Sequence, residues 1–110
     1  MNKEKIKKLE SLAHKIISEF FAENLKETEV DFWLINIVWI KISNDLSYLD
    51  IFVSSFKNED KLTKTLAWYA QDITKLINKD IKLYKMPKIR FRYDESGKIS
   101  QNIINTINSL

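Results

Sequence analysis

The chain has 110 residues, 45% hydrophobic and 30% charged, which gives room for one globular domain, since domains typically run to about 100–150 residues. It has no cysteine, which excludes disulfides, thiolate metal sites and a cysteine nucleophile, and no apolar run long enough for a membrane span or signal peptide, so we expect a soluble cytoplasmic protein. The net charge is +3, but residues 1–55 carry 7 cations against 9 acids (−2) and residues 56–110 carry 11 against 6 (+5), which indicates an anionic partner for the C-terminal half.

Residues 3–24 predict an amphipathic helix, because their apolar side chains recur with the 3.6-residue period of one helical stripe. The β-branched and aromatic residues 30–42 predict a strand. A polar turn and a second strand over residues 48–56 follow, so the two strands form an antiparallel hairpin. The first strand is apolar on both faces, which leaves its register open and allows a β-bulge.

Residues 60–79 predict a second helix with Asp60 as its N-cap. Pro87 precedes a short third strand, residues 88–93, whose side chains alternate between a basic face and a core face. A last apolar stripe over residues 99–110 predicts a third helix. The order helix-strand-strand-helix-strand-helix predicts one α+β domain over residues 1–110, with a three-stranded mixed sheet and the helices packed on one face.

The segment from residue 75 to residue 92 holds seven cations and one acid, a charge of 7 − 1 = +6. Cations concentrated on a helix end and an adjoining strand are typical of phosphate contacts in RNA-binding proteins. A solvated face of a lysine-rich protein is the alternative interpretation. The candidate RNA-binding residues are Lys75, Lys79, Lys82, Lys85, Lys88, Arg90 and Arg92.

Aromatic residues beside a basic strand can stack on unpaired bases, but the three tryptophans are more often core residues, with Trp39 as the exception and the candidate for contact with a partner. The only histidine, His14, is expected to be structural or solvent-facing. One glycine cannot build a phosphate-cradling loop, and the acids in turns are expected to cap the backbone. We therefore predict no catalytic residues, no metal site and no enzyme.

Two stretches resemble ribosome-binding factor A. Residues 86–96, MPKIRFRYDES, are similar to the family's Pro-x-(apolar)-x-Phe-x-x-Asp-x-Ser signature, and residues 40–54 resemble its strand, Ser-x-Asp-Leu turn and returning strand. The resemblance covers nearly the whole chain. It implies a KH-like (type II) fold and a non-catalytic, monomeric factor that binds the free, immature 30S subunit and its 16S rRNA and assists late maturation and rRNA processing. It implies no cofactor, small-molecule substrate or membrane.

The chain departs from the family at one place. Relatives usually interrupt the second helix with a small residue, any residue and Gly, whereas this chain has Tyr69-Ala70-Gln71 there. Without glycine the flexible backbone for a kink or a close approach to RNA is missing. We therefore expect Lys75 to Lys85 and the basic strand to carry more of the RNA contact than this bend. The alternative is a KH-like protein-interaction module that uses its apolar, Trp-containing first strand and binds little RNA.

Overall fold

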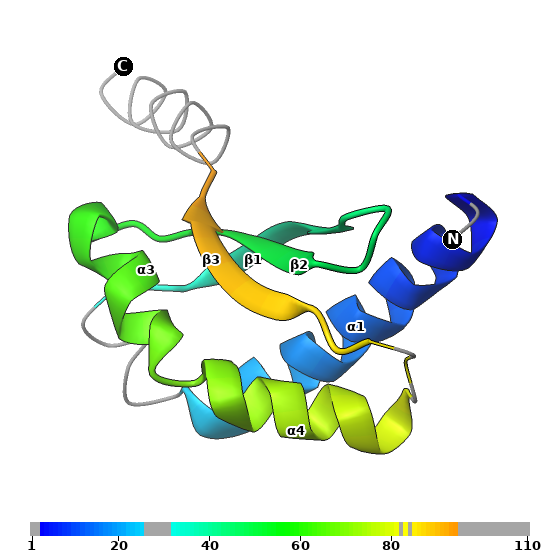
Figure 1. The fold of residues 1–110 in the computed structure, drawn as a ribbon. Coiled ribbons are helices and arrows are strands. Elements are labelled where there is room, and N and C mark those ends of the chain that lie inside the picture. The colour runs from blue at the N-terminus through cyan, green and yellow to red at the C-terminus, as the bar shows by residue number, and fades with distance from the viewer. Residues whose placement is uncertain (1–2, 26–31, 82, 84, 95–110) are drawn as a thin grey trace.

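The computed structural model describes residues 3–25, 32–81, 83 and 85–94, which form two layers (Figure 1). A three-stranded sheet forms one layer, and the described helices lie together on one side of it. This confirms the predicted α+β class and mixed sheet, whereas the helix predicted for residues 99–110 lies outside the described residues. The elements are α1 (Lys3–Asn24), β1 (Asn36–Ile42), β2 (Tyr48–Ser54), α3 (Glu59–Ala67), α4 (Ala70–Asp80) and β3 (Lys88–Tyr93).

The central strand is β2, which pairs antiparallel with β1 and parallel with β3. Its side chains alternate between the two faces of the sheet, as those of any strand do. Leu49, Ile51 and Val53 are fully buried beneath the helices. The core therefore lies between the sheet and the helical layer. Separately, no helix of the described residues is long and apolar enough to cross a membrane.

The first strand is shorter than predicted, since it begins at Asn36 and not at residue 30. Trp33 and Leu34 have φ angles of 55° and 79°. Left-handed backbone at two consecutive non-glycine residues ends any extended run. The apolar pattern continues upstream of Asn36, but the strand does not.

The β-bulge that the sequence pattern allows is present in β1. Ile37 opposes Val53 and Trp39 opposes Phe52, so Val38 is an extra residue without a partner on β2. Because of this insertion Ile37 faces the core and Trp39 faces the opposite side of the sheet. A regular strand would have put both on one face.

The second predicted helix is wrong in two respects. Its N-cap position is Asn58, two residues before the predicted cap, so the helix begins at Glu59 and Asp60 lies in the first turn. It is also broken into α3 and α4. The break falls at Trp68 and Tyr69, although glycine is absent there.

The break uses backbone geometry that ordinary residues adopt. The Trp68 N–H donates to the Thr65 carbonyl oxygen (3.3 Å) and the Tyr69 N–H to that of Leu66 (2.9 Å), which are the i→i−3 bonds of a tight 3₁₀ turn. Tyr69 has φ −94° and ψ −2°, in the sparsely allowed bridge region. Since no left-handed φ is needed, the kink forms without glycine.

Candidate nucleic-acid interface

The helices of the described residues leave one face of the sheet uncovered, and we call eight of its outward side chains the open face. Four of them are cations and one is an acid, so its formal charge is +4 − 1 = +3. All three cations of β3 that the sequence predicts to contact RNA lie on this face. The open face consists of Trp39, Lys41, Tyr48, Asp50, Phe52, Lys88, Arg90 and Arg92.

Asp50 organises both arginines of the open face. The parallel register places Arg90 directly opposite Asp50, and its Nε and Nη2 donate to the two carboxylate oxygens at 2.7 and 3.0 Å. Arg92 Nε lies 3.6 Å from Oδ2 of the same carboxylate. The hydrogen bond to Asp50 raises the pKa of the Arg90 guanidinium. The bidentate pair fixes the plane of a permanently charged group.

Arg90 also lies on an aromatic ring. Its guanidinium carbon is 3.8 Å from the centroid of the Tyr48 ring, a cation–π contact in which a flat cation covers a flat ring. Tyr48 is 39% exposed. The acid, the cation and the ring therefore form one ordered stack at the start of β2 and β3.

Trp39 is on the open face, in agreement with the prediction that it faces outward. Its indole stacks on Phe52 with 4.0 Å between ring centroids and 5° between planes, and its Nε1 donates to Asp94 Oδ2 at 2.8 Å. It remains 43% exposed. Trp33 and Trp68 are also exposed, so the expectation that they belong to the core is wrong.

The predicted RNA-binding residues do not form a single surface. Lys88, Arg90 and Arg92 share the open face, and Trp39 joins them there. Lys75 and Lys79 are exposed on α4, in the layer on the other side of the sheet.

The link between α4 and β3 holds the two remaining cations. Lys85 is exposed, and its Nζ lies 3.4 Å from Ser47 Oγ, which places it beside the β1–β2 turn. Lys82 lies outside the described residues. The +6 segment of the sequence is therefore distributed over more than one face of the molecule.

A groove that the sequence did not predict lies along β3, next to the break between α3 and α4. It has a volume of about 420 Å³, and Thr63, Lys64, Ala67 and Ala70 form its helical wall opposite residues 89–92. Its lining holds three cations, Lys64, Arg90 and Arg92, and no acid from the described residues. Two small residues of this lining, Ala67 and Ala70, lie on either side of the bend.

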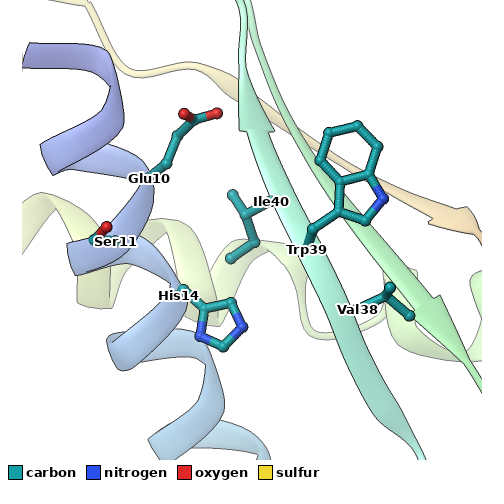
Figure 2. Close-up of a pocket in the computed structure, with 6 residues that line it drawn as sticks. All are labelled: Glu10, Ser11, His14, Val38, Trp39 and Ile40. Atoms are coloured by element: carbon teal, nitrogen blue, oxygen red, sulfur yellow. The ribbon is translucent and has the colours of Figure 1, made fainter. Parts of the chain in front are cut away.

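A second groove, of about 350 Å³, lies at the outer edge of β1. Figure 2 shows Glu10 and His14 on α1 facing this strand, with Ile40 between helix and strand and Trp39 on the far side. Glu10 Oε2 accepts the Ile42 N–H at 3.0 Å. His14 Nδ1 lies 3.4 Å from Ser18 Oγ. No group of three or more His, Cys, Asp or Glu among the described residues could hold a metal ion.

The chain is similar to known proteins over most of its length. A protein of Petrotoga mobilis named ribosome-binding factor A is 34% identical over 93% of this chain and 87% of its own length. The crystal structure of ribosome-binding factor A from Thermus thermophilus superposes with a TM-score of 0.67 at 16% identity, over 80% of this chain and 94% of that one.

A third match is the Thermus thermophilus protein as fitted into the cryo-EM map of a 30S–RbfA complex, with a TM-score of 0.51 at 16% identity, over 69% of this chain and 93% of that one. These structural similarities establish the KH-like fold. The sequence profile of the ribosome-binding factor A family matches residues 5–107. The chain therefore belongs to the ribosome-binding factor A family.

Proposed function

We propose that this chain is a non-catalytic assembly factor that binds the free, immature 30S subunit and its 16S rRNA in the cytoplasm, assists late maturation and rRNA processing, and then leaves. In this proposal residues 1–110 act as one domain and as a monomer. The observation that carries it is the cationic open face on a member of the ribosome-binding factor A family. The complex of the Thermus relative with the 30S subunit supports the choice of partner.

The arrangement of the open face supports contact with phosphates. Lys88 and Arg92 are exposed near the two ends of β3, and Asp50, the one acid of that face, is occupied by the arginines. Cations displayed in this way position a protein on RNA without reading base sequence. Lys75, Lys79, Lys82 and Lys85 extend the proposed contact beyond the open face.

The test is co-sedimentation of the full chain with free small subunits between about 50 and 200 mM salt. Binding should weaken steeply, because each phosphate contact contributes a slope of roughly −0.7 to −0.9 in log K against log[salt]. The double variant Lys88→Glu with Arg92→Glu should bind more weakly and with a shallower slope. Arg90 is left intact so that Asp50 keeps its partner.

The matched control changes the same net charge elsewhere. Lys8 and Lys15 are exposed on α1, away from the open face, so Lys8→Glu with Lys15→Glu should lower binding far less. Binding that does not depend on salt, or equal losses in the two double variants, contradicts the proposed contact.

The alternative function is a protein-interaction module of the same fold. It is favoured by the exposure of Trp39 on β1, since an exposed tryptophan is a common anchor in protein interfaces. If Trp39→Glu abolishes subunit binding while the β3 double variant changes nothing, the chain recognises a protein and not RNA.

A further inference from the structure

The open face exposes aromatic surface that the core does not use. The core lies on the other face of the sheet. On the open face the side chains of Trp39 and Tyr48 are 43% and 39% exposed. Phe52 lies opposite Trp39 on β2 and is half-buried against it. Exposed rings that stabilise no core are available to a ligand.

Both rings are held in place before any ligand arrives. Phe52 and Asp94 hold the Trp39 indole, one by stacking and the other by accepting its N–H. Arg90 covers Tyr48 while Asp50 holds the guanidinium plane with two hydrogen bonds. The face therefore offers two rigid planar stations, an indole and a guanidinium stacked on a phenol. Little side-chain freedom is lost when a flat ligand stacks on either.

The surroundings of these stations favour an anion. Lys41 and Lys88 are exposed on the two outer strands, and Arg92 follows along β3. Two carboxylates lie near these cations: Asp50, which is 14% exposed at its side chain, is paired with two arginines, and Asp94, which follows β3, accepts the Trp39 N–H. The occupant therefore needs both negative charges and flat rings.

We propose that the open face binds an unpaired segment of RNA, with one base stacked on Trp39, another at the Tyr48–Arg90 stack, and phosphates against the surrounding cations. Trp39 lies opposite Phe52, which is four residues or about 13 Å from Tyr48 along β2, so the two stations receive bases that are separated along the RNA strand. Bases in a duplex are stacked on one another and offer no free face, whereas unpaired bases stack on aromatic rings and on arginine planes. The inference rests on the proposed function and specifies the form of RNA that this face takes.

The test measures the binding of two labelled RNAs at one salt concentration. One is an oligouridylate of about 12 nucleotides, which is within the usual size range of single-stranded sites. The other is a duplex of equal length. The full chain should prefer the single strand. Trp39→Ala and Tyr48→Ala should each weaken single-strand binding about 5- to 150-fold, the range measured when a stacking ring is removed. Duplex binding should change little.

Three controls separate stacking from other effects. Trp39→Phe keeps a flat ring but loses the N–H to Asp94, so it should retain most of the single-strand affinity. Trp68→Ala removes an exposed indole outside the open face and should have no effect. Unfolding curves show whether each variant is folded.

Failure of this inference differs from failure of the proposed function. If the chain pellets with small subunits but Trp39→Ala and Tyr48→Ala bind the oligouridylate as the unchanged chain does, the stacking site is wrong and the assembly role stands. If the chain does not pellet with small subunits, both fail. A third result also overturns the inference. If Trp39→Ala no longer binds ribosomal protein free of RNA but still binds the oligouridylate, the open face binds a protein.

Discussion

Tyr69 packs edge to face on Phe20, with 5.9 Å between ring centroids and 69° between ring planes. This contact anchors the break between α3 and α4 on α1. The preceding residue, Trp68, is 86% exposed. Two adjacent aromatic residues at the bend therefore have opposite roles, one inside the fold and one outside it.

Tyr69→Ala should lower the free energy of unfolding by about 1–3 kcal/mol, because it removes a half-buried ring and an aromatic pair. Trp68→Ala is the matched control and should change it by less than about 0.5 kcal/mol, as exposed positions usually do. Urea unfolding of both variants measures the difference. Equal losses would mean that Tyr69 does not anchor the bend.

Asp50→Asn should change the kind of RNA that is bound. Removal of the carboxylate raises the charge of the open face and releases the guanidinium groups of Arg90 and Arg92 from a fixed position. Charge alone strengthens duplex binding, while loss of the ordered Tyr48–Arg90 stack weakens the preference for a single strand. The ratio of the duplex dissociation constant to the single-strand one should therefore fall, and an unchanged ratio would show that Asp50 does not order the face.

Asp45 should make the protein more stable above about pH 4 than at pH 2. Hydrogen bonds from Ser47, through its side chain and backbone N–H, and from the Ser43 hydroxyl lower the pKa of Asp45 from 3.8 to about 2. A depressed carboxyl pKa stabilises the folded state above the unfolded pKa, and this contribution is lost as the pH falls through the folded pKa.

Urea midpoints of the unchanged chain and of Asp45→Asn, compared from about pH 6 to about pH 2, test the linkage; the advantage of the carboxylate should be constant above about pH 4 and shrink towards pH 2. A difference independent of pH over that window would exclude it.

Glu10→Ala should lower the free energy of unfolding by about 1–2 kcal/mol, because the Ile42 N–H at the edge of β1 loses a charged acceptor. Glu10→Gln keeps a carbonyl oxygen at that place and should lose less. Thermal unfolding at neutral pH compares the two. A larger loss in Glu10→Gln would show that Glu10 does not act as this acceptor.

The sequence predicted best where one physical signal dominates. The bounds of α1 and β3 are as predicted. The 3.6-residue stripe fits only a helix, and the strict alternation after Pro87 fits only a strand. The prediction was wrong at Trp33 and Leu34, where left-handed backbone interrupts an apolar pattern that continues through it. It was also wrong at the helix break. There a 3₁₀ turn bends the backbone without glycine, and Tyr69 packs on Phe20.

The candidate site was harder to predict than the fold. Alternation placed Lys88, Arg90 and Arg92 on one face, and this is confirmed. Their pairing with Asp50 depends on the register between β2 and β3, two strands that are 40 residues apart at this pair. No local pattern contains that register, so the sequence could not show that the arginines are already engaged.

The unpaired Val38 has a consequence for the length of β1. Ile37 and Trp39 oppose neighbouring residues of β2, Val53 and Phe52, so a chain without Val38 could keep both pairs. Deletion at this position would turn the bulge into regular strand while Ile37 still faced the core and Trp39 still faced outward. One residue can therefore be gained or lost here without exchanging the two faces of the sheet.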